Sequence, residues 1–206
     1  MKALLISDLH GDQKLLRFLP KIVNDYDIIL CAGDLTNFGQ PEGYAELIDE
    51  IMIDKTCFWV SGNNDTQQEY QYRLKNMQNI DGKIVEYRGH KFAGLGGSYQ
   101  NYEAQNFGPS LIGKDSDLSG CVLLSHIPPS LKLKYSPVDI VCHSRLRRAN
   151  PLINNAPSAH ICGHLHDTAG VACIGSTKVI KLAPAKFGEY AEMDLDNLQV
   201  DFKKVK

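Results

Sequence analysis

The first third of the sequence alternates short apolar runs with amphipathic segments, and this alternation constrains the fold more than any other feature. Residues 2–7 (KALLIS), 27–32 (DIILCA) and 55–61 (KTCFWVS) have the length and near-continuous apolarity of buried strands. Segments 12–24 and 41–53 between them have helical apolar spacing, the first interrupted by Pro20 and the second with Pro41 at its start. The pattern predicts βαβ units and a parallel sheet covered by helices.

The later sequence has a different pattern of apolar runs and turns. Strand-like runs occupy residues 84–87, 91–95, 121–125, 137–142 and 157–161, and residues 144–153 have a helical pattern. Four further short strands, at 171–175, 178–183, 189–195 and 198–202, are divided by glycine, proline or Asp-Asn turns and predict a second, largely antiparallel sheet. Because no repeat or linker is visible, we expect two sheets that share one core, with residues 1–206 as a single domain.

The composition is that of an ordinary globular protein. The 206 residues are 43% hydrophobic and 22% charged, and the formal net charge is -2. This charge gives no general attraction to nucleic acid or to an anionic membrane, so phosphate recognition must be local. No run approaches the length of a membrane span, and the N-terminus lacks the features of a signal peptide.

Six cysteines lie in or at the end of strand-like runs, and none forms a C-x-x-C pair. Cys31, Cys57, Cys121 and Cys162 are in apolar runs, Cys142 ends another, and Cys173 belongs to a later strand. Such positions favour buried, reduced thiols over a thiolate zinc site. We therefore predict a cytoplasmic location.

Five apolar runs end in side chains that can bind metal: LLISDLHG, ILCAGDLT, FWVSGNND, VLLSHIPP and HICGHLHD. In an α/β sheet the carboxyl ends of the strands share one edge, where loops form the usual ligand crevice. Residues far apart in sequence can therefore converge there. The candidate ligands are Asp8, His10, Asp34, Asn63, His126, His164 and His166.

Seven such side chains exceed the needs of one tetrahedral zinc, and one of the two carboxylates could bridge two ions. The spacing in D-L-H and H-L-H places both members of each pair on one face of an extended segment. We therefore predict a dinuclear centre of divalent transition metals. Imidazole, carboxylate and amide oxygen suit manganese, iron or zinc, with nickel as a further candidate and manganese favoured.

The motifs SDLHG, GD, GNND, SH and GHLH, in this order, resemble the five motifs of the calcineurin-like metallophosphoesterase superfamily. HIPPS, CHSRLR and GLGGS further resemble its small predicted-phosphoesterase (Icc-related) branch. The resemblance implies an α/β fold of α+β mixed character, a four-layer αββα sandwich with two mixed β-sheets flanked by helices.

The resemblance also implies a role for each ligand. Asp8, His10 and His166 would bind one metal, Asn63, His126 and His164 the other, and Asp34 would bridge them. The net positive site would attract an anionic phosphate ester. A hydroxide bridging the two metals would attack phosphorus in line, without a covalent enzyme intermediate.

The sequence departs from the family pattern at Asn64, where the motif commonly has a histidine that stabilises or protonates the leaving oxygen. An amide cannot act as a general acid, although it can donate a hydrogen bond to developing charge. His143 is a candidate substitute acid, and an ordinary histidine at a helix start is at least as good an interpretation. We expect Asp65 to support the ligands from behind, and His90 to be a turn residue.

The favoured function is a metal-dependent phosphoesterase acting on small phosphodiesters. The alternatives are a phosphomonoesterase and a catalytically weak scaffold for protein partners. The scaffold is less favoured because all seven ligand positions are filled. The partner is expected to be a small phosphoester, with no membrane and no nucleic-acid polymer, since basic excess is absent. The natural substrate, the native metal and the oligomeric state are left open.

Overall fold

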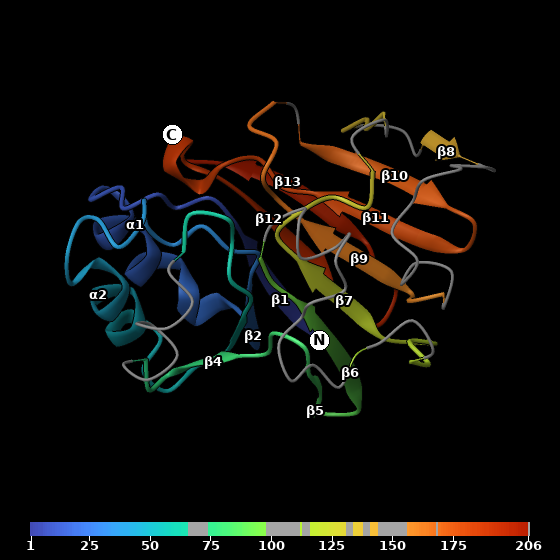
Figure 1. Cartoon of the computed structure of the whole chain (residues 1–206), viewed down its shortest axis with the longest axis horizontal. Helices are drawn as coiled ribbons and strands as arrows, with labels where there is room; N and C mark the ends of the chain where they lie inside the picture. The colour runs from blue at the N-terminus through green and yellow to red at the C-terminus, as the bar shows by residue number, and fades with distance from the viewer. Residues whose placement is uncertain are drawn as a thin grey trace.

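Two β-sheets pack face to face, and helices cover the outer face of the first sheet (Figure 1). The computed structural model describes residues 1–65, 74–97, 112, 116–130, 134–137, 141–143, 156–167 and 169–205, with residues 141–143 described by their backbone only. The α/β sandwich with two mixed sheets that the sequence predicts is confirmed. The predicted helix at 144–153 lies outside the described residues.

The first sheet has the strand order β13-β12-β1-β2-β3-β4. Strands β1 (Lys2–Ile6), β2 (Ile28–Cys31), β3 (Thr56–Trp59) and β4 (Met77–Asn79) run parallel to one another. Strand β12 (Glu189–Asp194) pairs antiparallel with β1, and β13 (Val200–Lys204) pairs antiparallel with β12. The parallel part brings the carboxyl ends of β1, β2 and β3 to one edge.

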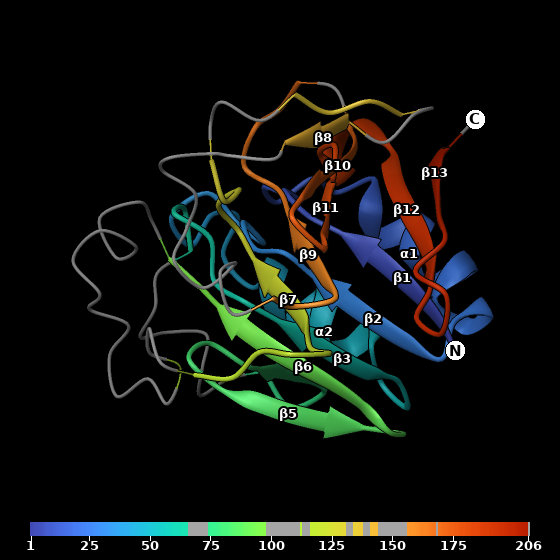
Figure 2. The same cartoon turned by 90° about the vertical axis from the view of Figure 1, so that its right-hand side faces the viewer.

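The second sheet has the strand order β5-β6-β7-β9-β11-β10-β8, which can be followed in Figure 2. Its strands are β5 (Ile84–Tyr87), β6 (His90–Leu95), β7 (Val122–Ser125), β8 (Val141–His143), β9 (Ala159–Cys162), β10 (Gly170–Ile174) and β11 (Thr177–Lys181). Pairs β6–β7, β7–β9, β9–β11 and β8–β10 are parallel, whereas β5–β6 and β10–β11 are antiparallel hairpins.

Two predictions about the second sheet are therefore wrong. Most of its strand pairs are parallel, because chain crossovers connect β6, β7 and β9. The last two predicted strands, 189–195 and 198–202, belong to the first sheet, where β12 pairs with β1 about 190 residues away: Lys2 is opposite Asp194. The hairpin signal between β12 and β13 is local and was readable, whereas the choice of sheet depends on this distant pairing.

Helices α1 (Leu15–Ile22) and α2 (Tyr44–Ile51) form the outer layer, with a 3₁₀ turn, η1 (Val23–Asp25), after α1. They pack against Leu4 and Ile6 of β1 in one apolar cluster. Pro20 lies inside α1 without interrupting it, since its missing N–H removes only one helical hydrogen bond and the helix ends two residues later. The helix after Pro41 begins three residues later than that proline.

The core between the sheets is built from the alternate side chains of the same strands. Ala3 and Leu5 of β1 face this core, whereas Leu4 and Ile6 face the helices. Phe58 and Phe92, from opposite sheets, contact each other edge to face with ring centroids 5.3 Å apart. The two sheets thus share one apolar core, and the assignment of residues 1–206 to a single domain stays a prediction.

The cysteines follow the sequence prediction in part. Cys31, Cys57, Cys121 and Cys162 are buried and free. Cys173 is disulfide-bonded, so the prediction of reduced thiols throughout is wrong at this position. The backbone of Cys173 pairs in register with that of Cys142 on the neighbouring strand, a proximity that sequence spacing did not reveal. A cytoplasmic location stays a prediction; among the described residues, no helix is long and apolar enough to cross a bilayer.

Candidate metal centre

The seven predicted ligands come from five loops, each following a strand. Asp8 and His10 follow β1, Asp34 follows β2, Asn63 follows β3, His126 follows β7, and His164 and His166 follow β9. Two hydrogen bonds join the loops of the two sheets: His164 N donates to Asp8 Oδ2 at 3.1 Å, and His126 Nδ1 donates to Ala32 O at 2.8 Å. The structure therefore brings all seven side chains to one edge shared by both sheets.

The first group of ligands consists of Asp8, His10 and His166. His166 Nε2 lies 3.0 Å from Asp8 Oδ1 and 3.1 Å from His10 Nε2, and His10 Nε2 lies 3.6 Å from Asp8 Oδ1. These ligand atoms fall within 4.8 Å of one another, close enough to hold one ion. Asp8 is fully buried, whereas the His166 side chain is 35% exposed and lies on the solvent side of the group.

The second group consists of Asn63, His126 and His164, with Asp34 beside them. Asn63 Oδ1 lies 2.9 Å from His126 Nε2 and 2.9 Å from His164 Nδ1. His126 Nε2 lies 3.3 Å from Asp34 Oδ2. His126 is fully buried between the two sheets, and Asn63 is exposed. Asp8, Asp34 and His126 also offer ligand atoms within 4.8 Å of one another, and the assignment of each ligand to one of two metals stays a prediction.

Asp34 lies between the two groups. Its Oδ2 is 3.3 Å from His126 Nε2 and 3.7 Å from His10 Nε2. Asn64 holds this carboxylate with two hydrogen bonds, from its backbone N–H to Oδ1 at 2.8 Å and from its amide Nδ2 to Oδ2 at 2.9 Å. Asn64 Oδ1 also accepts a hydrogen bond from Asn63 Nδ2. Asn64 therefore orients one ligand from each side of the centre.

The donor chemistry of these side chains fits a cation. His10 Nδ1 donates to Asn37 Oδ1 at 2.7 Å, and His126 Nδ1 donates to Ala32 O, so in the neutral tautomers both Nε2 atoms present lone pairs. Those nitrogens face carboxylate, amide and imidazole acceptors at 2.9–3.7 Å. Lone pairs directed at one another repel, and a bound divalent ion would satisfy them.

Burial opposes ionisation of five members of the centre, and charged neighbours outweigh this effect at four of them. The five are Asp8, His10, Asp34, His126 and His164. Hydrogen bonding and charge from the histidines lower the pKa of Asp8 and of Asp34 despite burial, and the two carboxylates in turn raise the pKa of His10 and of His126. Burial, aided by the charge of His126, lowers the pKa of His164. Since ligation requires neutral imidazole, metal binding is expected to release protons.

The backbone is held in the left-handed region at four ligand positions. Asp8, His10, Asp34 and His164 have φ values of 57°, 49°, 54° and 69°. Non-glycine residues rarely adopt this conformation, and it persists only where the surrounding structure enforces it. The concentration of strained backbone at predicted ligands is an independent sign of a functional site.

Asp65 supports the centre from behind. Its carboxylate accepts backbone hydrogen bonds from Asp34 at 2.9 Å, Gly62 at 2.8 Å and Thr36 at 3.2 Å. It therefore fixes the loop that carries Asp34 against the loop that carries Asn63. Burial raises the pKa of Asp65 to about 6, although the hydrogen bonds oppose this shift. The expectation that Asp65 acts behind the ligands agrees with these contacts.

Other sequence candidates lie elsewhere. His90 begins β6, and its Nε2 is 3.2 Å from Asp196 Oδ1. His143 is the last residue of strand β8, and its backbone pairs with that of Ile174 in β10. This end of the second sheet is opposite to the end at which Cys162 and the loop after β9 lie. The side chain of His143 is not described, so its role as an acid stays a prediction, and the backbone register does not favour it.

Sequence reasoning missed three residues at this edge. Ser7 Oγ donates to Asp8 Oδ2 at 2.7 Å, and Asn37 both accepts from His10 Nδ1 and donates to His10 O. Lys186 lies close enough for its charge to oppose protonation of His10. Ser7 and Asn37 adjoin the motifs, in ISDLH and DLTNF, and could have been found as neighbours of ligands; Lys186 lies 20 residues after the last motif, without such a signal.

Two facing sheets with a histidine–carboxylate centre at their shared carboxyl edge define the class of metallophosphoesterase-like α/β sandwiches. A family model described as calcineurin-like phosphoesterase matches residues 1–168, and the chain belongs to this family.

Relatives of known sequence or structure match most or all of the chain. MJ1162 of Methanocaldococcus jannaschii, named only as an uncharacterised protein, is 27% identical over 206 residues, covering 92% of this chain and 91% of its own length. TT1561 of Thermus thermophilus superimposes with a TM-score of 0.71 at 18% identity, covering 100% of this chain and 99% of its own. YfcE, a phosphoesterase from E. coli, gives a TM-score of 0.51 at 14% identity, covering 100% of both chains. The two solved structures share the fold.

Proposed function

We propose that the chain hydrolyses phosphoester bonds with the help of two divalent metal ions, and that small phosphodiesters are its preferred substrates. The observation that carries the proposal is the convergence of lone-pair donors in two adjoining groups, with the Asp34 carboxylate between them. When bound, the ions would supply an activated water as nucleophile and neutralise charge on the phosphate. Manganese is our first choice, because the set mixes imidazole, carboxylate and amide oxygen.

The residues of the chain would hold and orient the reacting groups. Asp8, His10 and His166 would bind one ion and Asn63, His126 and His164 the other, while Asp34 would contact both. Asn64 would keep Asp34 and Asn63 in place through its amide. One of the two hydrogens of that amide is donated to Asp34. The other can only form a hydrogen bond to the leaving oxygen, because an amide has no acidic proton to transfer. We therefore propose that the enzyme prefers esters of good leaving groups.

Diesters are proposed ahead of monoesters on the basis of charge. A monoester dianion is commonly matched by arginine, and neither of the two arginines among the described residues reaches the centre. Arg88 pairs with Asp27, and Arg17 lies on α1. Lys186 is near His10. A singly charged diester needs fewer cationic partners, so the described surroundings fit it better.

The test begins with metal. The metal-free chain would be loaded separately with manganese, iron, zinc or nickel, and the bound metal counted by elemental analysis. Hydrolysis of bis(p-nitrophenyl) phosphate, p-nitrophenyl phosphate and cyclic nucleotides would then be compared. We expect two ions per chain, faster diester hydrolysis and reversible loss of activity with a chelator. A folded chain that binds no metal would refute the proposal and favour the scaffold alternative; faster monoester hydrolysis would refute only the diester preference.

A further inference from the structure

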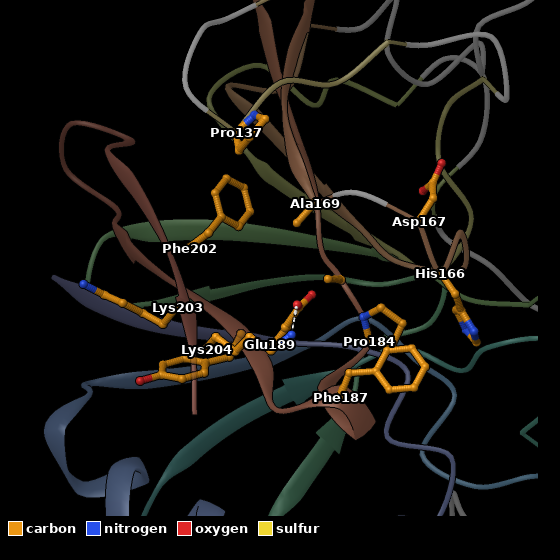
Figure 3. Close-up of a pocket in the computed structure, with 12 residues that line it drawn as sticks. Pro137, His166, Asp167, Ala169, Pro184, Phe187, Glu189, Phe202, Lys203 and Lys204 are labelled. Carbon is orange, nitrogen blue, oxygen red and sulfur yellow. Dashed lines mark hydrogen bonds and ion pairs between the residues drawn. The ribbon is translucent and has the colours of Figure 1, made fainter. Parts of the chain in front are cut away.

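A cavity of about 570 Å³ opens beside the metal centre and is assigned no role by the proposed reaction (Figure 3). Its volume lies in the range of small-molecule sites. His166, a candidate ligand, forms part of its wall. The other described residues that line it are Pro137, Asp167, Ala169, Ala183, Pro184, Phe187, Glu189, Tyr190, Phe202, Lys203 and Lys204.

The connection between β11 and β12 places this cavity against the centre. The connection contains a 3₁₀ turn, η3 (Ala185–Phe187). Ala185 N donates to Ser7 O at 2.8 Å, and Lys186 N donates to Asp8 O at 3.4 Å. Phe187 is therefore attached, through two backbone contacts, to the residues that lead into the first group of ligands. A phosphate at the centre would lie next to this wall.

The lining offers aromatic rings and few unpaired charges. Phe187 is 55% exposed, so its ring is accessible to a ligand in the cavity. Figure 3 shows Phe187 and His166 towards one end of the lining and Phe202 towards the other. Glu189 pairs with Lys204 at 2.8 Å, and Asp167 pairs with Lys181. The lining is thus better suited to a planar, uncharged group than to a second anion.

We propose, on the basis of the function proposed above, that this cavity binds a planar aromatic group of the phosphodiester substrate while its phosphate lies at the metal centre. Phe187 stacks on that group, and Pro184 and Phe202 complete its apolar surroundings. An aryl ester and a nucleoside ester share this chemistry. Phe187 is then a specificity-determining residue rather than a catalytic one.

The test measures binding of phosphates to the metal-loaded protein by calorimetry, without turnover. Methyl phosphate reports on the metal centre alone, phenyl phosphate adds an aromatic ring, and adenosine 5′-phosphate adds a nucleoside. We expect Phe187→Ala to weaken phenyl phosphate binding about tenfold, the usual effect of losing a stacked ring, and to leave methyl phosphate binding unchanged. A similar loss with adenosine 5′-phosphate identifies a nucleoside as a natural occupant; a loss with phenyl phosphate alone identifies an aryl group.

Two further variants sharpen the comparison. Phe187→Leu keeps an apolar side chain without a ring and should bind phenyl phosphate with intermediate strength. Phe38→Ala removes another phenyl ring, 68% exposed and absent from the described lining, and should bind both phosphates as the parent does. Since Phe187 is more than half exposed, its replacement should leave the fold intact, which thermal denaturation would check.

The outcomes separate this proposal from the function on which it rests. Equal affinity of the parent protein for methyl and phenyl phosphate would overturn the cavity assignment even if diesters are hydrolysed. So would a loss of phenyl phosphate affinity in Phe38→Ala as large as the loss in Phe187→Ala. Binding of phenyl phosphate that depends on Phe187, in a protein that hydrolyses no ester, would retain the cavity and refute the enzymatic function. A protein that binds none of the three phosphates would overturn the cavity assignment as well.

Discussion

Replacing Gly163 with alanine should damage the first group of ligands more than it damages the fold. Gly163 precedes His164, and a Cβ atom at this position would lie 1.9 Å from Ser7 Oγ and 2.5 Å from Asp8 Oδ2. Side-chain Cβ atoms essentially never approach other atoms closer than 3.0 Å, so Ser7 Oγ alone must move by about 1 Å. Ser7 and Asp8 are fully buried and hydrogen-bonded to each other, so neither can move freely.

The size of the effect follows from this crowding. Overpacking a buried site costs about 1–3 kcal/mol. In a chain of this length each kcal/mol corresponds to about 2–4 °C in Tm, so we expect the Tm of the metal-free protein to fall by about 2–12 °C. Displacement of Asp8 should lower metal affinity by about 10- to 100-fold, as is usual when ligand orientation is disturbed.

Stability would be measured by thermal and urea denaturation of metal-free protein, and affinity by competition with a chromophoric chelator. Gly89→Ala is the control: its Cβ would meet no atom within 4 Å, although its φ of 81° is strained for alanine. It should lose stability but bind metal normally. The double variant Ser7→Ala, Gly163→Ala should recover part of the stability and none of the affinity, because the contact with Asp8 remains. Parent-like metal affinity in Gly163→Ala would refute this reasoning.

Three further predictions concern single side chains. Asp34→Asn should abolish turnover and lower metal content without loss of fold, measured by assay, elemental analysis and circular dichroism; full activity with unchanged metal content would contradict the dinuclear centre. Asn64→His should narrow the difference in hydrolysis rate between esters of good and poor leaving groups, by raising the rate on poor ones up to about 10²-fold. This replacement also removes the amide contact to Asp34. If the rate of the parent is independent of leaving-group pKa, the parent already contains another acid. Burial lowers the pKa of His160 to about 3, so the unfolded chain takes up a proton below pH about 6.5 that the folded chain does not. The metal-free parent should therefore lose up to about 1.4 kcal/mol of stability per pH unit between pH 6.5 and 3 relative to His160→Gln; parallel stability curves would show that His160 is accessible to protons.

The ligands were predictable because their placement depends on strand polarity. Once the apolar runs are taken as parallel strands, Asp8, Asp34 and Asn63 must share an edge, whatever the exact strand boundaries. The left-handed backbone at Asp8 and Asp34 was not predictable, because neither residue type nor spacing requires it. It results from the packing of five loops against one another.

Features that depend on distant partners were not predictable. Strand β4 is short and polar in sequence. Its position depends on Asp49 of α2, whose carboxylate accepts backbone hydrogen bonds from Lys75, Asn76 and Met77 at the start of the strand. The proximity of Phe187 to the metal centre depends likewise on backbone contacts of η3 with the residues just after β1, some 180 residues earlier. No local pattern encodes such contacts.

The pairing of β12 with β1 has a consequence for synthesis of the chain. Strand β1 is made first, yet one of its two hydrogen-bonding edges finds its partner only when residues 189–194 have emerged. At typical elongation rates of about 5–20 residues per second, that edge stays open for roughly 10–40 s. An open apolar edge is a template for wrong pairing. We therefore expect ribosome-bound chains that end before β12 to aggregate or to be held by chaperones.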